Sequence, residues 1–404
     1  MIHIPEEIHN KTTFLTRGSK TISNTPCIVF DESRINFLSD LSKSLLSKAN
    51  IREYPDVATF AFWCRKSNLM RIAKNQTDKN LRLGVGLAFH ISPSNVPVNF
   101  AFSLAFGVLS GNICVVRLPS EDHISALIII DEINTLLNNK KYGYDSNFIH
   151  LIKFDRDDRV NQFWISIADA RVVWGGDDTV ELMRSYKCKP RSREVVFPDR
   201  FSLSTIRAKC LLDLNKNEIH TLCENLFNDI YIMDQNACTS PQLLAWVGDS
   251  SIILEAKKIL WDAFIRYVVS KHKLEPIHYM DKYVNACENA ILNENVASVK
   301  HDNNLLFNIE LSHFSDQQQS QRGYFGTVHE ISIKDLNELS KIIDERCQTL
   351  TYFGFDVEEL KNFVVSNKLR GIDRIVPIGR SLDMGVIWDG YDIIEHLSRI
   401  VHIN

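Results

Sequence analysis

The sequence predicts an α/β fold built around a doubly wound parallel sheet, and three observations support that prediction. Short apolar runs of strand length alternate with helical patterns in the first half of the chain, as in a parallel sheet with helical crossovers. The 404 residues suggest two domains, or one domain interrupted by another. Apolar residues make up 45% and charged residues 24%, a balance typical of a globular protein with a large core.

The first half of the chain has the more regular pattern. Residues 1 to about 50 form a lead-in, and the buried strand 83–91 (LGVGLAFHI) is followed by a turn cluster and a mostly apolar helix. Gly111-Asn112 ends that helix as a C-cap pair. The predicted elements are helices 35–47 and 56–75, strand 83–91, helix 98–109, strand 113–118, helix 121–138 and strands 148–154 and 170–174.

The second half is less regular. Three consecutive glutamines within 303–321 predict a strand followed by a polar surface loop. No repeat or long low-complexity segment interrupts the chain. The other predicted elements are short strands 195–197 and 202–205, helices 217–227 and 252–269 on either side of the loop 234–241, helix 336–345 and strand 348–353.

Charge and cysteine content exclude several classes of function. The 46 basic and 50 acidic residues are mixed along the chain with a net charge of −4, so nucleic acid binding has little support. The nine cysteines form no CxxC pair and no zinc-spaced cluster, so we expect no metal. Without a signal-peptide pattern, they indicate the reducing cytoplasm. Polar residues interrupt the apolar stretch 96–116, which predicts a buried helix and strand and no membrane span.

A nucleotide cofactor needs a phosphate-binding turn between a strand and a helix. Gly84 and Gly86 begin a G-x-G-x-x-G pattern, but Phe89 occupies the third glycine position, so a standard Rossmann turn is absent. Two other strand-to-helix junctions remain, at residues 92–95 and 175–176, and main-chain N–H groups at helix N-termini bind phosphates. Taken alone, each junction is more often an ordinary turn, and both interpretations stay open.

Among the cysteines, Cys238 has surroundings that suit a nucleophile. It lies in the polar segment 234–242 (DQNACTSPQ), where Pro241 favours a loop or a helix start. A loop cysteine near a helix N-terminus often has a depressed pKa, which favours the nucleophilic thiolate. Most buried cysteines are inert packing groups, which is our interpretation of those at positions 114, 210, 223 and 287. The local sequence leaves an inert Cys238 open as well.

Four segments resemble one family. Residues 83–121 resemble the aldehyde dehydrogenase superfamily segment with its P-W-N-F-P and G-N-…-K-P-S-E landmarks. More closely, they look like the LuxC-type acyl-CoA reductases of bacterial bioluminescence systems. Residues 234–242 are similar to that family's nucleophile loop, and residues 347–354 (CQTLTYFG) and 371–390 (GIDRIVPIGRSLDMGVIWDG) resemble its C-terminal stretches. The four matches occur in the family's order.

The resemblance implies an aldehyde dehydrogenase-like fold with an interrupted first domain. Residues 1–206 would form a nicotinamide cofactor domain with a doubly wound parallel sheet, and residues 207–365 an inserted α/β catalytic domain that carries the nucleophile. Residues 366–404 would return to the cofactor domain or to an oligomer interface. Members of the superfamily associate through an extended strand arm, so the resemblance also implies a dimer or tetramer.

The resemblance also assigns site residues. Cys238 would carry the acyl group, and the Asn95 amide with the main-chain N–H of Cys238 would stabilise the oxyanion. Without the resemblance, Asn95 would be a turn former before Pro97. Arg117 lies beside the position of a lysine that contacts the adenosine ribose, although Leu118 separates it from the proline; the alternative is a surface charge at a strand end. The other implied cofactor-binding residues are Ser92, Pro93, Ser94, Ser120, Glu121, Gly175 and Gly176.

Two departures from the superfamily pattern favour reduction over aldehyde oxidation. Oxidative members carry a water-activating glutamate in E-L-G-G-K, whereas this sequence has residues 196–201 (VFPDRF), with Phe197 and no matching glutamate. The glutamate of E-I-F-G-P, which holds the nicotinamide ribose, corresponds to Gly323. Water activation would harm a site that hands its acyl group to hydride. The second loss predicts a cofactor that is held more loosely or by other groups.

The predicted activity is the NADPH-dependent reduction of a fatty acyl thioester, on coenzyme A or on a protein, to the aldehyde through an acyl-enzyme on Cys238. NADPH follows from the resemblance, although Glu121 could repel a 2′-phosphate that Arg117 could attract. Acyl-transferase or synthetase proteins and further copies of the chain are the expected partners. The alternatives are an oxidative aldehyde dehydrogenase, a catalytically degenerate acyl-binding subunit and an acyl-phosphate reductase. The sequence identifies no general acid for the leaving thiol.

Overall fold

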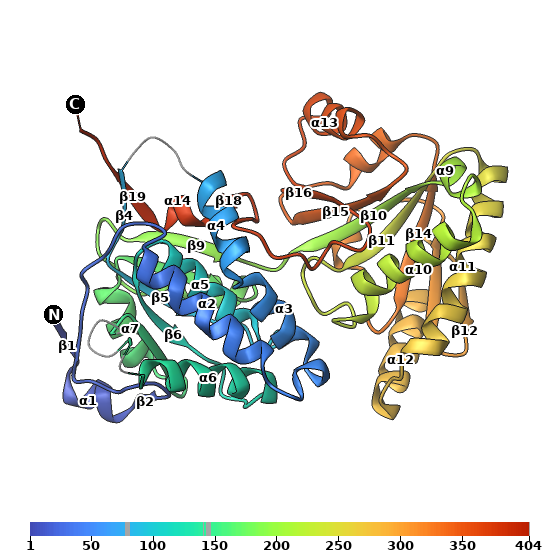
Figure 1. Ribbon diagram of the computed structural model, residues 1–404. Helices are drawn as coiled ribbons and strands as arrows, with labels where there is room; N and C mark the ends of the chain where they lie inside the picture. Colours follow the sequence, from blue (N-terminus) through green and yellow to red (C-terminus); the bar gives the residue numbers. More distant parts are fainter. Residues whose placement is uncertain (77–80, 140, 143–146, 404) are drawn as a thin grey trace. The chain divides into compact units, whose positions relative to one another are not determined.

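The computed structural model describes residues 1–76, 81–139, 141–142 and 147–403, and the chain divides into two compact units (Figure 1). The first unit comprises residues 1–198 and 384–404, and the second comprises residues 199–383. These boundaries differ from the predicted ones after residues 206 and 365. The reason is that β10 (Phe201–Arg207) and β16 (Arg374–Pro377) are both strands of the second unit's sheet.

The first unit is built around a six-stranded sheet with the order β2-β7-β6-β5-β8-β9. All neighbouring pairs are parallel except β2 with β7. The chain runs from β5 through β6 to β7 and then returns to the other side of β5, so the sheet is doubly wound as predicted. The strands are β2 (Thr13–Phe14), β5 (Leu87–Ile91), β6 (Ile113–Arg117), β7 (Ile149–Lys153), β8 (Ala170–Trp174) and β9 (Arg193–Phe197).

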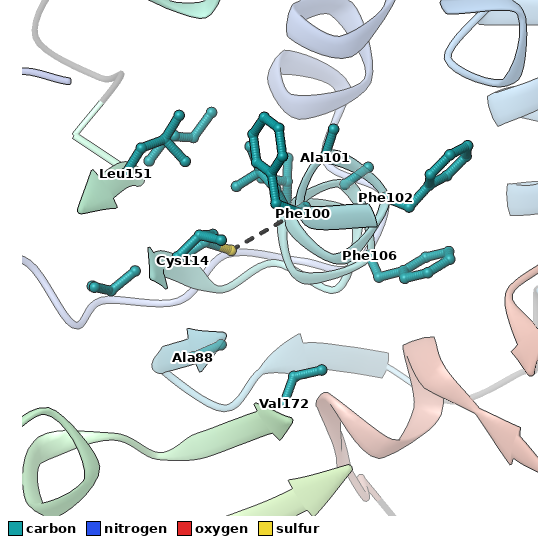
Figure 2. Close-up of a cluster of buried hydrophobic side chains, with 14 of the residues drawn as sticks. Ala88, Phe100, Ala101, Phe102, Phe106, Cys114, Leu151 and Val172 are labelled. Atoms are coloured by element: carbon teal, nitrogen blue, oxygen red, sulfur yellow. Dashed lines mark hydrogen bonds between the residues drawn. The ribbon is translucent and has the colours of Figure 1, made fainter. Parts of the chain in front are cut away.

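Helix α5 (Asn99–Leu109) is the central helix of this unit's core. All of its residues are buried, which is why its sequence is apolar on every side. Figure 2 shows Phe100, Phe102 and Phe106 pointing outward from α5, with Cys114 of β6 close by. The other helices of the unit are α1 (Glu6–Asn10), α2 (Glu32–Leu46), α3 (Pro55–Trp63), α4 (Lys66–Asn75), α6 (Ile124–Leu137), α7 (Asp158–Ile167), α8 (Asp177–Ser185) and α14 (Ile393–His396).

The predicted helix 56–75 is two helices, α3 and α4. The chain between them is extended at Arg65 (φ −58°, ψ 138°). The Asn68 side chain donates to the carbonyl of Trp63 (2.7 Å), so a hydrogen bond across the break replaces part of the helical ladder. The apolar pattern predicted the buried face correctly and could not reveal this change of direction.

The predicted strand 83–91 is also two elements. Gly86 has φ 135°, a conformation that L residues rarely adopt, and it separates β4 (Leu81–Gly84) from β5. β4 pairs antiparallel with β19 (Ser398–Val401) outside the main sheet. The two glycines that began the incomplete G-x-G-x-x-G pattern therefore serve the backbone path before β5.

The second unit contains a seven-stranded sheet with the order β12-β13-β14-β11-β10-β15-β16. Only the edge pair β12–β13 is antiparallel. The amino ends of β10, β11, β14, β15 and β16 therefore lie along one edge of the sheet. The strands not yet bounded are β11 (Pro241–Val247), β12 (Val296–Asp302), β13 (Leu306–Leu311), β14 (Thr327–Ile333) and β15 (Cys347–Phe353).

The helices of the second unit were predicted only in part. The sequence predicted α10 and α11 but not α12, α13 or strand β11. The predicted helix 336–345 is a 3₁₀ helix over Leu336–Lys341. The helices are α9 (Ala208–Leu212), α10 (Lys216–Tyr231), α11 (Ser250–Lys271), α12 (Pro276–Leu292) and α13 (Val357–Ser366).

The glutamine-rich segment is partly buried: the prediction of a polar surface loop is right for Asp316, Gln317 and Ser320, which are exposed, and wrong for three of the glutamines. Gln318 is fully buried, and Gln319 and Gln321 are each 6% exposed. Gln318 Nε2 donates to Gln321 Oε1 (2.9 Å), and Gln321 Nε2 donates to Asn295 Oδ1 (2.9 Å). Gln319 donates to the carbonyl of Ile342. Partners for the amides remove most of the cost of burying them, and the sequence does not reveal those partners.

The remaining strands are short and belong to the first unit. They are β1 (Ile2–His3), β3 (Thr21–Ile22), β17 (Ile387–Trp388) and β18 (Tyr391–Asp392). In the part of the chain that the structure describes, no helix combines the length and the apolar character needed to cross a membrane.

Candidate active site

The loop that carries Cys238 lies at the amino ends of the parallel strands in the second unit. β11 begins three residues after Cys238, and Cys238 is half-buried. Ser202 in β10 donates through Oγ to the carbonyl of Cys238 (2.7 Å) and accepts from the main-chain N–H of Thr349 in β15 (3.2 Å). One hydroxyl therefore connects the loop to two neighbouring strands.

Gln235 is the main anchor of this loop. Its main chain is in the left-handed region (φ 60°) and it is only 2% exposed. The amide nitrogen donates to the carbonyls of Pro241 (3.1 Å) and Thr327 (3.0 Å). The amide oxygen accepts from the main-chain N–H groups of Gly326 (2.9 Å) and Thr327 (3.0 Å). Four hydrogen bonds satisfy the amide and hold the loop against the amino end of β14.

Gln242 repeats this arrangement on the other side of Cys238. Its Nε2 donates to the carbonyl of Gln235 (3.1 Å), and its Oε1 accepts from the main-chain N–H of Gly323 (2.9 Å). A Cβ atom at residue 323 would collide with the main chain of Thr327. The absence of a glutamate at Gly323 therefore has a local cause, because this backbone leaves no room for a side chain.

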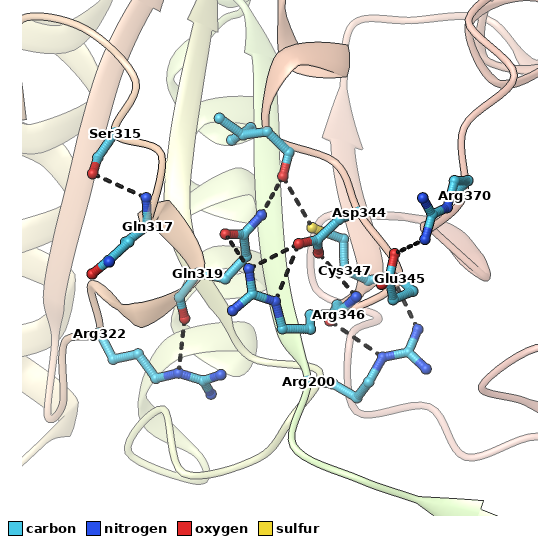
Figure 3. Close-up of polar contacts among 11 residues, drawn as sticks. Arg200, Ser315, Gln317, Gln319, Arg322, Asp344, Glu345, Arg346, Cys347 and Arg370 are labelled. Carbon is cyan, nitrogen blue, oxygen red and sulfur yellow. Dashed lines mark hydrogen bonds and ion pairs between the residues drawn. The ribbon is translucent and has the colours of Figure 1, made fainter. Parts of the chain in front are cut away.

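A second polar network continues from the residue before Gly323 (Figure 3). Arg322 Nε donates to the main-chain carbonyl of Gln319 (3.3 Å). The side-chain oxygen of Gln319 accepts from Arg346 (3.1 Å). Arg200 in turn donates to the carbonyl of Arg346 (3.2 Å). The glutamine segment thus connects the amino ends of β10 and β15 to Gly323, whose main-chain N–H donates to Gln242 of the Cys238 loop.

Arg374 brings a positive charge close to Cys238, and the sequence assigned it no role. Its two terminal nitrogens donate to the carbonyls of Ser381 (2.6 Å), Arg380 (2.8 Å) and Asp383 (2.7 Å). Burial lowers the pKa of Arg374, and the negative charge of the Cys238 thiolate is among the charges that oppose this lowering. Arg374 and Cys238 therefore lie within electrostatic range of each other.

Asp229 in α10 fixes the segment that holds Arg374. Its carboxylate is buried and accepts from the main-chain N–H groups of Gly379 (2.7 Å) and Ser381 (2.9 Å). Burial raises the pKa of Asp229 to about 6, although these hydrogen bonds and Arg374 lower it. The family-like stretch 371–390 was the only sequence signal for this arrangement, and Asp229 itself carried none.

The first unit holds the two predicted cofactor loops. Residues 92–95 follow β5 and residues 175–176 follow β8, and these two strands are neighbours where the strand order reverses. Ligands of open α/β sheets bind outside the carboxyl ends of strands at such a switch point. Asn95 is exposed in the first loop. Because Asn95 and Cys238 belong to different units, their joint oxyanion site stays a prediction.

Two polar groups beside the first loop are buried without a protein partner. Ser92 Oγ and Arg117 Nε both lack a hydrogen bond to any residue described. The main-chain N–H of Ser92 donates to the carbonyl of Arg117 (3.1 Å), so the two residues are adjacent. The Arg117 guanidinium lies 4.4 Å from the ring centre of Phe154 and is half-buried, and burial lowers the pKa of Arg117. Unpaired buried polar groups are rare unless a ligand or water completes them.

The other predicted residues of this corner are more exposed. Lys153 Nζ donates to the carbonyl of Ser120 (3.3 Å) and pairs with Asp122. The Glu121 side chain is 81% exposed and lies 4.0 Å from His123. Glu121 therefore places no fixed negative charge beside Arg117. In the same turn cluster, Pro93 is half-buried and Ser94 is exposed.

The second predicted cofactor loop, residues 175–176, leaves space for a ligand, but two neighbouring carboxylates disfavour an anion there. Gly176 is the N-cap of α8, and an added Cβ atom there would meet nothing within 4 Å. Asp177 and Asp178 occupy the first turn of α8, where they oppose an anion. Trp174 at the end of β8 stacks on Phe197 with ring centres 3.6 Å apart. Aromatic packing thus fills this end of the strand pair, and Phe197 supplies no carboxylate there.

The residues at this edge of the first unit fit a dinucleotide cofactor. Ser92 and Arg117 supply unpaired polar groups, and no described side chain caps the N-terminus of α5 that follows. Gly176 leaves room for a close approach to the main chain. Within the described ranges, no three His, Cys, Asp or Glu side chains are grouped so that they could hold a metal ion.

Comparisons with known proteins show which family this chain matches. The profile of one family, described as "Acyl-CoA reductase (LuxC)", matches residues 31–400. The chain is 23% identical over 337 residues to a long-chain acyl-protein thioester reductase of Photobacterium phosphoreum, covering 78% of this chain and 62% of that protein. It is 24% identical over 165 residues to the protein of the same name from Aliivibrio fischeri, covering 41% and 33%. The aligned parts thus span less than two thirds of these relatives.

The solved structures support the fold. Aldehyde dehydrogenase 21 from Physcomitrella patens superimposes with a TM-score of 0.62 at 14% identity, covering 91% of this chain and 85% of that protein. An identity this low supports the fold and nothing finer. The predicted aldehyde dehydrogenase-like fold is confirmed.

Proposed function

Because the chain belongs to the LuxC family of acyl-CoA reductases, we propose that it reduces an acyl thioester to an aldehyde with a nicotinamide cofactor. The observation that carries the proposal is the setting of Cys238. The thiol residue is half-buried in a loop fixed by Gln235 and Gln242, and the Arg374 guanidinium acts on it. A fixed position and a nearby positive charge are what a thiolate nucleophile needs.

The first step is acyl transfer to the protein. The Cys238 thiolate attacks the carbonyl carbon of the thioester, a new carbon–sulfur bond forms, and the carrier sulfur leaves and takes up a proton. The main-chain N–H of Cys238 and the side-chain amide of Asn95 stabilise the oxyanion between these events.

The second step is reduction of the enzyme thioester. A bound nicotinamide supplies a hydride to the acyl carbon. The resulting thiohemiacetal on Cys238 collapses as its carbon–sulfur bond breaks, which releases the aldehyde and restores the thiolate. One hydride and one proton are consumed overall, and the products are the aldehyde and the carrier thiol. Phe197, stacked on Trp174, supplies no carboxylate that could activate water, so the acyl-enzyme is spared hydrolysis.

NADPH is the finer proposal for the cofactor. Arg117 lies at the carboxyl end of β6, with Lys153 at the end of the neighbouring strand β7. The charge of Arg156 also reaches Arg117, where it lowers the pKa of that guanidinium further. Positive charges at this edge favour a 2′-phosphate, and the exposed Glu121 is free to turn away.

A fatty acyl group carried by a protein or by coenzyme A is the proposed substrate. Both curated relatives described above are named long-chain acyl-protein thioester reductases. By analogy, an acyl-transferase or a synthetase would supply the acyl group as a partner protein. Short, branched or aromatic acyl thioesters serve as the comparison substrates that test the chain-length part of the proposal.

The test of the activity is product formation with matched cysteine variants. We expect wild type to convert tetradecanoyl-CoA and NADPH to tetradecanal, and Cys238→Ala to lose at least about a thousandfold in turnover because no other group can carry the acyl chain. Cys210→Ala is the control, since Cys210 is also half-buried in the second unit. Its turnover should remain within about twofold of wild type.

Two other outcomes would replace the proposal. Oxidation of tetradecanal with NADP⁺ to the free acid, faster than reduction of the thioester, would favour an oxidative aldehyde dehydrogenase. Binding of acyl-CoA without any turnover, in wild type and Cys238→Ala alike, would favour an acyl-binding subunit. Turnover of an acyl phosphate in preference to the thioester would favour an acyl-phosphate reductase.

A further inference from the structure

Helix α12 buries a lysine where a surface helix normally buries apolar side chains. Its buried residues are Lys282, Ala286 and Asn289, and Lys282 is fully buried. The ammonium of Lys282 donates to the main-chain carbonyl of Leu305 and, at 2.6 Å, to that of Phe325. Burying an ammonium is unfavourable, and an apolar side chain of the same size would pack here without that penalty. Packing alone therefore does not explain the lysine.

Lys282 lies within electrostatic range of the Cys238 loop. Burial lowers the pKa of Lys282 to about 7, and the charge of Asp234 opposes this lowering. Asp234 is the first residue of the segment 234–242 that carries Cys238, and its carboxylate lies 3.2 Å from Nε2 of His272 at the end of α11. The buried amine is thus close to the reactive loop, although no step of the proposed reaction uses it.

The turn formed by Phe325 and Gly326 has a backbone that needs support from its surroundings. Phe325 has φ 55° and Gly326 has φ 83°, so two consecutive residues are in the left-handed region. A non-glycine residue keeps such a conformation only where neighbouring groups determine it. Lys282 binds the Phe325 carbonyl, and the ring of His278 stacks on the Phe325 ring with centres 4.2 Å apart. Two side chains of α12, four residues apart on one face, therefore hold Phe325.

Two asparagines extend this face of α12. Asn285 Nδ2 donates to the carbonyl of Arg322 (3.3 Å), and Asn289 Oδ1 lies 2.9 Å from His329 Nε2 in β14. Residues 278, 282, 285 and 289 follow one another at intervals of four, three and four, which places them on one side of a helix. We call these four residues the inner face of α12. The inner face therefore contacts the segment 322–329 at its beginning, its middle and its end.

The same segment holds the loop of the proposed nucleophile through its main-chain N–H groups. Gly326 and Thr327 donate to Gln235 Oε1 at 2.9 and 3.0 Å. The Gly326 N–H shares one planar peptide group with the Phe325 carbonyl, which accepts from Lys282. Because the two groups of a trans peptide point in opposite directions, a donor that fixes the carbonyl also fixes the direction of the N–H. The ammonium polarises the peptide as well, which strengthens the bond to Gln235.

Loss of the lysine would act mainly on this peptide group. The Leu305 carbonyl also accepts from the Tyr231 hydroxyl (2.9 Å), so it would keep a donor. The Phe325 carbonyl would lose the ammonium, and the peptide would then be free to rotate. Rotation would turn the carbonyl oxygen toward Gln235 Oε1, where the two oxygens repel each other, and the bond from the Gly326 N–H would be lost.

We propose that Lys282 is a positioning residue for Cys238. Its ammonium fixes the peptide between Phe325 and Gly326, this peptide fixes the Gln235 amide, and Gln235 fixes the loop that presents the thiol. Lys282 is fully buried, so it acts through these groups and touches neither the substrate nor the cofactor. The effect on turnover rests on the proposed function, whereas the effect on the loop does not.

Amide hydrogen exchange of the full chain tests the connection without any reaction. Lys282→Met keeps most of the side-chain volume and removes the donor. We expect the Gly326 and Thr327 amides and the segment 234–242 to exchange at least about tenfold faster than in wild type, because the loop opens more often. His278→Ala removes the stacked ring and should raise the same exchange about threefold, which keeps the test available if Lys282→Met does not fold.

Lys257→Met is the matched control. Lys257 is another partly buried lysine of the second unit, with a side chain 14% exposed, and it pairs with Glu310 and Glu330. Its substitution removes an ion pair in which neither residue of the Phe325–Gly326 turn takes part. The exchange of the segment 234–242 should therefore stay within about twofold of wild type.

Steady-state kinetics separates a positioning role from a purely structural one. Lys282→Met should lower kcat with tetradecanoyl-CoA at least about tenfold and leave the KM values for thioester and NADPH within about twofold, because only the presentation of the thiol changes. Lys257→Met should keep the kcat of wild type. A double variant that combines Lys282→Met with Gln235→Ala should be no slower than Gln235→Ala alone, because both residues act through one peptide.

Three results would overturn the proposal. Unchanged exchange of the segment 234–242 in both Lys282→Met and His278→Ala would exclude the connection. An equal rise in Lys257→Met would show a general loss of stability. Faster loop exchange with an unchanged kcat would leave Lys282 a structural residue. A wild type that turns over no acyl thioester would refute the proposed function alone, since the difference in exchange would still support the connection.

Discussion

The two sheets of this protein present their candidate site residues at opposite strand ends, and the loops there are held in different ways. In the first unit the loops lie at the carboxyl ends of β5 and β8, and Ser92 Oγ and Arg117 Nε there are buried without a described partner. In the second unit the reactive loop lies at the amino ends of its strands, and every polar atom of the Gln235 amide is satisfied. The difference separates two tasks. A ligand that comes and goes is met by groups that await it, whereas the loop of the proposed nucleophile is held by two glutamine amides that are already paired, although Ser240 Oγ in the same loop is buried without a described partner.

The largest expected effect comes from removing the Gln235 amide, which holds the Cys238 loop of the second unit. Gln235→Ala would leave the main-chain N–H of Gly326 buried and unpaired, whereas the N–H of Thr327 would keep its bond to the carbonyl of Tyr324 (3.2 Å), and the cost in the free energy of unfolding is about 3 kcal/mol. Chemical denaturation measures this cost. Gln317→Ala is the control, because Gln317 is exposed, and its change should stay within about 0.5 kcal/mol. Equal effects of the two substitutions would contradict the anchoring role of Gln235.

The next effect is a pH dependence that originates at Asp229. Burial raises the pKa of this carboxyl from 3.8 to about 6 in the folded protein. The folded state therefore binds more protons than the unfolded state between these values. The stability that Asp229 contributes is fully present below its unfolded pKa and is lost as the pH rises through 6.

We expect the free energy of unfolding of wild type, relative to Asp229→Asn, to fall by about 2.4 kcal/mol between pH 4 and pH 7. Denaturation of both proteins at several pH values in this range gives the difference directly. A difference that is flat, or that grows with pH, would mean that the folded protein does not favour the protonated carboxyl.

A smaller effect is expected in the first unit, where Arg117 should change the KM for the cofactor. Arg117→Ala should raise the KM for NADPH about tenfold and leave the KM for NADH nearly unchanged, because the proposed partner of the lost charge is the 2′-phosphate, which NADH lacks. Steady-state kinetics with both cofactors measures the ratio. Arg159→Ala is the control, since Arg159 is a surface arginine of the same unit with a 76% exposed side chain. A parallel rise for both cofactors would place Arg117 away from the 2′-phosphate.

The smallest effect concerns Gly176. An added Cβ atom meets nothing there, and the residue has an ordinary negative φ of −63°. Gly176→Ala should therefore change the free energy of unfolding by less than about 0.5 kcal/mol. If a cofactor approaches this main chain closely, the same substitution raises the cofactor KM. An unchanged KM would remove residues 175–176 from the cofactor site.

The sequence predicted the first unit better than the second, for a physical reason. Strands β5 to β8 are buried on both faces, so their apolar runs are continuous and easily recognised, as is α5. The strand order is not encoded in those runs, so the proximity of residues 92–95 and 175–176 emerged only from the structure. Gly86 interrupts the predicted strand through its backbone conformation, which composition does not reveal.

In the second unit, the sequence singled out Cys238 and none of the residues that hold its loop. Cys238 and both anchoring glutamines lie within the segment that resembles the family, but their spacing does not show that Gln235 reaches β14. Gln319 looked like a surface residue because its amide is polar, and it is buried because Arg346 and Ile342 satisfy it. Arg374 and Asp229 are 145 residues apart in sequence, so only the fold brings them together.

The most direct test of the account is the mass of the protein after it is mixed with tetradecanoyl-CoA, before and after NADPH is added. The account predicts that wild type gains one tetradecanoyl group on Cys238, located by peptide mass spectrometry. It also predicts that NADPH removes this group as tetradecanal. In Cys238→Ala the adduct should be absent. A wild-type protein that gains no acyl group from long, short or aromatic thioesters, or that carries the group on another cysteine, would contradict the acyl-enzyme on Cys238.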